Sequence, residues 1–264
     1  MNKNVKNVFK ALIISTGVVG GIAFVSDFIQ KQHNKKSKIV LLSNKHKEKG
    51  IYEKYIKRPL DAMISWNALI ILSPFLLGIG GIVRAKLGSP VFFVQKRAGL
   101  DEKIFKMIKF RTMTDERNEN GDLLPDEERF TSLGNFLRKS SIDELPELLN
   151  VLNGDMSLIG PRPLYTYYVP YYTKEEAMRH SVRGGITGLA QINGRAIKPI
   201  EDRLKYDLQY VDNITFINDL KIFLMTIVKV LKADDVGQPT IDDAKCLNEV
   251  RTVQRPEKVK EFND

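Results

Sequence analysis

The feature that most restricts the fold is an apolar segment, Ala62–Val83, with Ser73-Pro74 at its middle. The segment is long enough for a membrane-spanning helix. Proline there removes one backbone hydrogen bond, and the serine hydroxyl can bond a carbonyl that is left without its donor. Basic residues flank the segment on both sides, so a simple crossing would leave one basic flank on the wrong side. We therefore expect a re-entrant helix that turns at Ser73 and Pro74, with a kinked spanning helix as the alternative.

A second apolar run, Ala11–Ile29, precedes it and carries one charge, Asp27. Its length is about the minimum for a spanning helix. A signal peptide is the alternative, but no small-x-small cleavage site follows, and the basic tract after the run would then be exported. Lysine and arginine are more frequent after the run than before it, so the positive-inside rule places its C-terminal side in the cytoplasm.

The formal net charge of +9 is unevenly distributed along the chain. Residues 1–60 hold 13 Lys and Arg against 3 Asp and Glu, whereas residues 61–264 hold 28 against 29. The positive excess therefore belongs to the N-terminal region, where it suits anionic lipid headgroups and does not indicate nucleic-acid binding by the rest. The single cysteine, Cys246, excludes an intramolecular disulfide and argues against a thiolate zinc site.

Residues 140–152, SSIDELPELLNVL, place two adjacent carboxylates where an apolar helix is expected to begin. Ser141 and Glu144 fit the capping box S-x-x-E, in which two side chains bond backbone N–H groups at a helix start. Acidic residues also suit the positive end of the helix dipole. From these residues alone, a structural role for Asp143 and Glu144 is favoured over a catalytic one.

The remaining pattern predicts a compact α+β domain. Residues 91–94 and 104–113 are expected to be short strands joined by a turn at 98–101. We expect an exposed loop at 114–128, helices at 130–139 and 201–213, and a glycine-rich loop at 184–195. Residues 220–231 predict an interfacial or core-packing helix, and the chain from Asp234 a peripheral tail.

Arg162 differs from the other basic residues because it lies between two prolines. Its backbone loses little entropy on binding, and a guanidinium fork matches phosphate oxygens. An acidic pair, stiff arginines and a membrane-dipping helix together indicate phosphate chemistry at a lipid interface.

Several stretches in the right order make the chain resemble the monotopic bacterial sugar transferases, the polyprenyl-phosphate phosphoglycosyl transferases. They are KRPLD, Ser73-Pro74, GSPVFFVQKRAG, FKMIKFRTM, LGNFLRKSSIDELPELLNVLNGDMSLIGPRP, GITGLAQINGR and YDLQYVDN. The resemblance runs from about Lys57 to about Leu231. Gly184 departs from it, since the family usually has proline before Gly-Ile-Thr-Gly; this departure bears on substrate fit more than on the reaction class.

The resemblance implies a reaction in which a nucleotide sugar, usually a UDP-sugar, gives its phosphosugar to undecaprenyl phosphate and UMP leaves. It implies Asp143 as the nucleophile of a covalent phospho-aspartyl intermediate and Glu144 as a ligand of Mg²⁺. Such a lipid-linked product begins a bacterial surface glycan, such as a capsule, an exopolysaccharide or a lipopolysaccharide. The resemblance also makes five residues candidates for substrate contacts, namely Lys109, Arg111, Arg138, Arg162 and Asp207.

The expected organisation has five parts. They are a hydrophobic, transmembrane segment at 1–30, a basic cytoplasmic linker at 31–58, a re-entrant membrane helix at 59–84, a catalytic sugar-transferase domain at 85–233 and a charged tail at 234–264. The fold class is a small membrane-associated α+β domain with a re-entrant N-terminal membrane helix, short strands and amphipathic interfacial helices. The expected location is the bacterial cytoplasmic membrane, with the catalytic domain at the cytoplasmic face against inner-leaflet lipid.

Three other interpretations stay open from the residues. The first is a membrane-anchored scaffold that has lost activity, and the second is a basic nucleic-acid-binding protein. The third is a two-substrate enzyme that has no covalent step.

Overall fold

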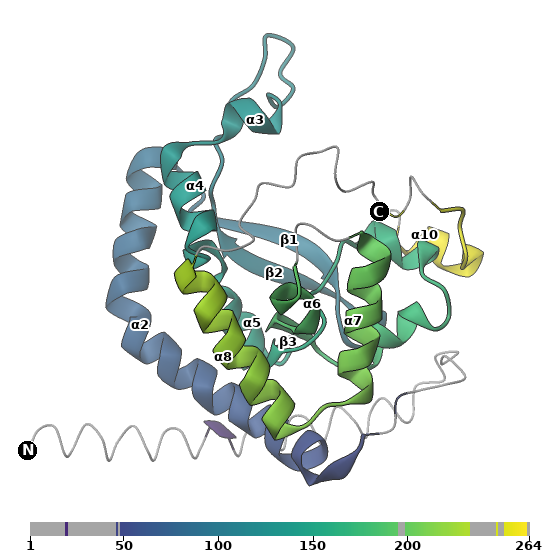
Figure 1. The fold of residues 1–264 in the computed structure, drawn as a ribbon. Coiled ribbons are helices and arrows are strands. Elements are labelled where there is room, and N and C mark those ends of the chain that lie inside the picture. The colour runs from purple at the N-terminus through teal and green to yellow at the C-terminus, as the bar shows by residue number, and fades with distance from the viewer. Residues whose placement is uncertain are drawn as a thin grey trace, which may run out of the picture.

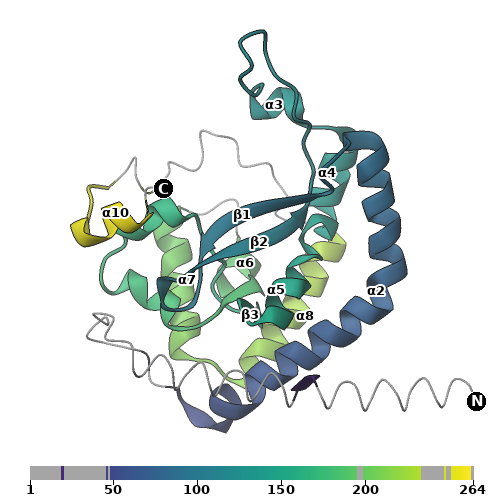
Figure 2. The same ribbon diagram turned by 180° about the vertical axis from the view of Figure 1, so that it is seen from behind.

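The computed structural model describes residues 19–20, 46, 48–194, 199–232, 247 and 251–262. Within these residues it is a mixed structure of helices and short strands, as expected. The predicted hydrophobic segment at 1–30 and most of the predicted basic linker lie outside the described residues, as does most of the stretch from 233 to 250. In Figures 1 and 2 the long helix α2 runs along one side of the molecule and α10 lies at the opposite side.

Most of the elements along the chain are helices. They are η1 (Tyr52–Ile56), α2 (Lys57–Leu87), β1 (Phe92–Ala98), η2 (Leu100–Glu102), β2 (Ile104–Phe110), α3 (Asp126–Arg129), α4 (Ser132–Lys139), η3 (Ile142–Glu144), α5 (Glu147–Asn153), β3 (Met156–Ile159), η4 (Thr166–Tyr171), η5 (Glu176–Ser181), β4 (Gly184–Thr187), α6 (Leu189–Ile192), α7 (Ile200–Asp212), α8 (Phe216–Lys232), η6 (Pro256–Lys258) and α10 (Val259–Phe262).

Helix α2 continues through Ser73-Pro74 and does not break there. Pro74 has no N–H to donate to the carbonyl of Ile70, and the Ser73 hydroxyl donates to that carbonyl instead, at 2.8 Å. The expected role of the serine is therefore confirmed. Both views show α2 changing direction partway along its length (Figures 1 and 2). The helix therefore stays continuous at the predicted break, because the serine supplies a hydrogen bond to the carbonyl that the proline leaves without its donor.

By length and composition, Tyr52–Leu87 is the one helix among the described residues that could cross a membrane. Several of its large apolar side chains have no protein to cover them, including Ile71 and Leu77, which are 68% and 77% exposed. Its first turns are anchored in the domain, since the Arg58 guanidinium donates to the carbonyls of Val151 and Leu152 at the end of α5.

Strands β1 and β2 form the antiparallel hairpin that the sequence predicts, although β2 ends at Phe110. Phe93 is paired with Lys109, and Arg97 with Phe105. Directly paired residues project to the same face of an antiparallel sheet. The face that carries Lys109 also carries Met107, which packs in the core with Val151 of α5, so this face of the hairpin is turned toward α5.

The expected glycine-rich loop at 184–195 is wrong over most of its length, since Gly184–Thr187 is strand β4, parallel to β3, and Leu189–Ile192 is helix α6. The two backbones approach so closely that a Cβ on Gly185 would lie 2.1 Å from the backbone nitrogen of Gly160. Glycine is required there by the neighbouring backbone and not by a turn. The pairing brings residues 156–159 beside residues 184–187 and fixes the chain that follows β3.

The capping box predicted for Ser141 and Glu144 is also wrong. Ser141 is in the left-handed region, with φ of 56°, and its side chain makes no capping hydrogen bond. Asp143 and Glu144 belong to the 3-10 turn η3, and α5 begins only at Glu147, after Pro146. Pro146 is the N-cap of α5, and its side chain offers no oxygen for a capping hydrogen bond. Glu144 is consequently directed to other partners.

Helix α7 forms as predicted, and α8 packs in the domain, as one of the two predictions for it required. One face of α8 buries Ile222 and Asp219, and the helix packs on α6, β3 and β4. On its other side Ile217 and Leu231 are 77% and 80% exposed.

The described part of the predicted peripheral tail is packed into the domain. Phe262 and Leu247 are buried in the apolar cluster that contains Tyr172 and Leu204. The Arg255 guanidinium forms a buried ion pair with Glu102 in the turn between β1 and β2. This segment therefore contributes to the core, in contrast to the expectation from its charged composition.

Candidate active site

The adjacent carboxylates lie at a sharp reversal of the chain between α4 and α5. Helix α4 begins with Thr131, whose hydroxyl accepts from the Gly134 N–H at 3.0 Å. The left-handed residue Ser141 then turns the chain into η3. Asp143 is buried in η3, with 7% of its surface exposed.

Two cations form ion pairs with Glu144 and Glu147, the carboxylates that follow Asp143 in the chain. Lys109 Nζ of β2 lies 2.9 Å from Glu144 Oε1 and 3.4 Å from Glu147 Oε1. Arg162 forms an ion pair with the same Glu144 oxygen and lies 3.5 Å from Glu147 Oε1. Asp143, Glu144 and Glu147 are called the acidic cluster below. The sequence analysis missed Glu147, although its spacing of three residues from Glu144 was a signal that both could share one helical face.

Arg162 owes its position to β3. The strand ends at Ile159, and Pro161-Arg162-Pro163 follows, where the guanidinium also donates to the Ile186 carbonyl of β4 at 2.9 Å. Burial lowers the pKa of Arg162, but the charges of the acidic cluster, Glu144 foremost, raise it by more. Arg162 is therefore a permanent cation with a fixed direction, as its proline neighbours predicted.

The ionisation of Asp143 reflects opposed influences. Burial raises its pKa most, and the charge of Glu144 acts in the same direction. Lys109, Arg162 and Arg138 lower it. Arg138 is held near by a hydrogen bond from its Nε to Thr112 Oγ1 at 3.0 Å and by the ring of Phe130, 4.4 Å away.

The other two predicted site residues are held differently. Arg111 donates to the carbonyls of Ser89 and Met113 and pairs with Asp115 at 2.8 Å, and no contact joins it to the acidic cluster. Asp207 of α7 is buried and accepts two hydrogen bonds from Arg179, at 2.8 and 3.0 Å. Arg179 also donates to the Arg162 carbonyl, so Asp207 supports Arg162 through a second arginine.

The donor set of the acidic cluster suits a hard cation. Carboxylate oxygens are the ligands that Mg²⁺ prefers, commonly one or two of them together with substrate phosphate. Within the residues that the structure describes, no group of three His, Cys, Asp or Glu side chains is arranged to hold a metal alone. The residues therefore fit a Mg²⁺ ion that shares its coordination with a phosphate.

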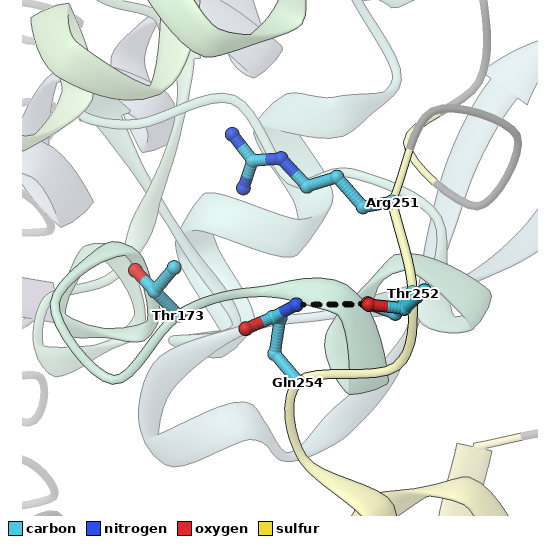
Figure 3. Close-up of a pocket in the computed structure, with 4 residues that line it drawn as sticks. All are labelled: Thr173, Arg251, Thr252 and Gln254. Carbon is cyan, nitrogen blue, oxygen red and sulfur yellow. Dashed lines mark hydrogen bonds between the residues drawn. The ribbon is translucent and has the colours of Figure 1, made fainter.

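The concave surface in Figure 3 lies elsewhere. It encloses about 410 Å³ and is lined by Thr173, Arg251, Thr252 and Gln254, where the C-terminal segment meets the turn before η5. Its Arg251 is already paired with Glu176 at 2.8 Å. No predicted site residue lines this pocket.

The fold joins a long apolar helix to a domain in which largely buried carboxylates meet largely buried cations. The model of the bacterial sugar transferase family matches residues 52–233, and the chain belongs to that family. It is a phosphoglycosyl transferase by this membership, and the prediction of the family and of its extent along the chain is confirmed.

Three relatives illustrate the similarity. An uncharacterized sugar transferase, EpsL of Bacillus subtilis (strain 168), is 52% identical over 183 residues, which are 69% of this chain and 91% of the relative. The exopolysaccharide production protein ExoY of Sinorhizobium fredii (strain NBRC 101917 / NGR234) is 37% identical over 195 residues, which are 66% of this chain and 84% of the relative. The UDP-glucose:undecaprenyl-phosphate glucose-1-phosphate transferase of Klebsiella pneumoniae is 40% identical over 66% of this chain, but only 39% of that relative is covered.

Proposed function

We propose that this chain transfers a phosphosugar from a UDP-sugar to undecaprenyl phosphate and releases UMP, at the cytoplasmic face of a bacterial membrane. The observation that carries the proposal is the acidic cluster together with the nearby cations Lys109, Arg138 and Arg162, which could bind phosphate oxygens. The printed names of relatives support the substrates, since that of Klebsiella pneumoniae uses UDP-glucose and undecaprenyl phosphate.

The transfer divides into two displacements at phosphorus. A carboxylate oxygen of Asp143 attacks the phosphorus that bears the sugar, the bond to the bridging oxygen breaks, and UMP leaves with that oxygen. The acyl-phosphate formed on Asp143 is then attacked by an oxygen of undecaprenyl phosphate, and the carboxylate is released. Covalent catalysis suits two substrates that come from different phases, because they need not meet in one complex.

Fixed cations reduce the electrostatic repulsion between an anionic nucleophile and an anionic phosphate. Lys109 and Arg162 already sit against the acidic cluster, so they can move from carboxylate to phosphate oxygens with little reorganisation. Glu144 would hold Mg²⁺, with Glu147 beside it, and the bound ion would neutralise charge on the diphosphate.

The membrane attachment that we propose rests on exposed apolar side chains. Phe75 and Leu77 of α2 are 46% and 77% exposed, and Phe223 and Leu224 of α8 are 47% and 52% exposed. Side chains of this kind suit a lipid environment better than water. With the bend at Pro74, a re-entrant α2 would keep both of its basic flanks in the cytoplasm.

The direct test is Asp143→Asn in the full chain, with UMP release measured against a panel of UDP-sugars and undecaprenyl phosphate. We expect a loss of at least about a thousandfold, because the amide cannot act as the nucleophile. Asp202→Asn is the matched control, since Asp202 is an exposed carboxylate paired with Lys205 at 3.0 Å, and it should leave activity unchanged.

A second measurement examines the covalent step. Incubation with UDP-sugar alone should add the mass of a phosphosugar to the peptide that contains Asp143. Turnover by Asp143→Asn would refute this nucleophile, and activity without any mass shift would favour direct transfer between the two substrates.

A further inference from the structure

The charges described so far at the acidic cluster cancel. Its three carboxylates face three cations, which are Lys109, Arg138 and Arg162. Apart from the Mg²⁺ ion proposed for it, the site therefore has no net attraction for a diphosphate, and a further cation would add to that attraction. Arg97 at the end of β1 provides one.

Arg97 lies on the face of the hairpin that carries Lys109. Gln95 pairs with Met107 and Arg97 with Phe105, so the two basic side chains project to the same face, which is turned toward α5. The backbone of Arg97 is also bridged to Tyr165, three residues after Arg162. The hairpin and the chain after β3 thus hold Arg97 beside Arg162.

The side chain of Arg97 is buried without a carboxylate partner. It is 9% exposed, and no ion pair joins it to an Asp or Glu of the described residues. Its guanidinium stacks on the Tyr165 ring at 3.8 Å and donates to Gln95 Oε1 at 2.5 Å and to the Pro163 carbonyl at 3.4 Å. Its buried Nε–H has no hydrogen-bond partner in the described structure.

Such a cation is held at a cost, because burial disfavours its charge and lowers its pKa, although the nearby Tyr165 and the charge of Glu147, which does not form an ion pair with it, oppose this. The charge of Arg162 lowers the pKa of Arg97 further. Buried cations are normally paired, and an unsatisfied buried N–H calls for an explanation. An anion that binds during the reaction would satisfy both.

We propose that Arg97 binds a phosphate group of a substrate together with Arg162, as a positioning and binding residue of the transferase. The inference rests on the proposed function, because it requires that a phosphate reach the acidic cluster. Stacking on Tyr165 fixes the guanidinium plane. A phosphate would bind through the unpartnered Nε–H and an N–H that now donates to Gln95, since a planar fork can bind two phosphate oxygens. The phosphate belongs either to the nucleotide sugar or to the polyprenyl phosphate.

The test compares Arg97→Gln and Arg97→Lys with Lys96→Gln in the full chain. Lys96 is the exposed neighbour on the opposite face of β1, so its substitution removes the same charge without reaching the site. We expect Arg97→Gln to raise the KM of one substrate by about tenfold to a hundredfold, with a smaller change in kcat. Arg97→Lys should recover part of the loss, since it keeps the charge and lacks the fork.

The two sources of the phosphate are separated by varying one substrate at a time. A higher KM for the UDP-sugar, together with weaker binding of UDP by calorimetry, assigns Arg97 to the donor. A higher KM for undecaprenyl phosphate assigns it to the acceptor. Unchanged KM values for both substrates in a folded Arg97→Lys protein would overturn the inference, and this variant decides the matter if Arg97→Gln does not fold.

Failure of the proposed function gives a different result. In that case the wild-type protein itself would release no UMP from any UDP-sugar and would not bind UDP, and the Arg97 variants would show no difference from it. An active wild type with insensitive Arg97 variants would leave the transferase function standing and remove Arg97 alone.

Discussion

Lys109 and Arg162 each contact both Glu144 and Glu147. A change in the charge of any one of these four side chains therefore alters the ion pairs of the others. Such shared contacts couple the ionisation of neighbouring groups. The pKa of Asp143 is raised although three cations lie near it, because burial and the charge of the adjacent Glu144 outweigh them. Phosphate that enters the site would take over some of these contacts, and the carboxylates would be released for the metal and the nucleophilic step.

His180 gives a prediction at the residue scale that is independent of the reaction. Burial, with the nearby charge of Arg179, lowers its pKa to about 3. Its Nδ1 lies 3.1 Å from the Gly99 carbonyl, and Nε2 is buried without a hydrogen-bond partner among the described residues. A neutral ring that donates through Nδ1 fits these contacts, whereas a protonated Nε2–H would have no acceptor.

The pH dependence of stability follows from that shift. Between pH 6.5, the ordinary pKa of histidine, and pH 3, the unfolded chain binds a proton at His180 that the folded chain does not. Stability is therefore lost as the pH falls through this range, by about 2 kcal/mol from this residue at pH 5. His180→Gln should reduce by that amount the difference in urea-unfolding free energy between pH 7 and pH 5. An equal pH dependence in the two proteins would contradict the burial of a neutral ring.

At the scale of elements, the C-terminal segment is attached by a buried ion pair. The side chains of Arg255 and Glu102 are 5% and 7% exposed, and Lys258 Nζ lies 3.2 Å from the same carboxylate. Gln254 and Arg255 also donate their N–H groups to the Pro170 carbonyl. This segment lies beyond the family match at 52–233, so its attachment is a feature that the family pattern does not contain.

Arg255→Met should destabilise the protein by about 3 kcal/mol, because removal of Arg255 leaves the buried Glu102 carboxylate with Lys258 as its one remaining ion-pair partner among the described residues. Lys205→Met removes an exposed pair with Asp202 and should cost about 0.5 kcal/mol or less. Urea unfolding of both variants in one detergent provides the measurement. Equal losses in the two would show that the buried pair contributes no more than a surface pair.

At the scale of the whole molecule, the bend in α2 bears on which side of a membrane its two ends occupy. Single cysteines placed at Lys54 and Lys86, in a Cys246→Ser background, should react with an impermeant reagent from the same side. Pro74→Ala restores an N–H for the Ile70 carbonyl and should straighten the helix, so that the label at Lys86 becomes accessible from the other side. Labelling of the unmodified helix from opposite sides would contradict the re-entrant arrangement.

The whole molecule also shows which parts of the fold the sequence could predict. The hairpin, α7 and α8 were predicted because alternation and helical periodicity are local properties of the chain. Strand β4 was not predicted, because Gly184 and Gly185 resemble a loop until the backbone of Gly160 is placed against them. The start of α5 was misplaced because Ser141 and Glu144 fit a cap whose geometry the chain does not adopt.

The sequence by itself determined the family and the hydrogen bond at Ser73-Pro74, and it pointed to the acidic pair and Arg162, because each is carried by neighbouring residues in a short motif. Only the tertiary structure decided which cations meet the carboxylates. Lys109 and Arg111 are two residues apart, yet Lys109 reaches the acidic cluster, whereas Arg111 bonds the Ser89 carbonyl. Glu147 of α5 meets Lys109 of the hairpin and Arg162 of the chain after β3, three segments that are far apart in the sequence. Such convergence depends on contacts between distant segments, and no local pattern encodes it.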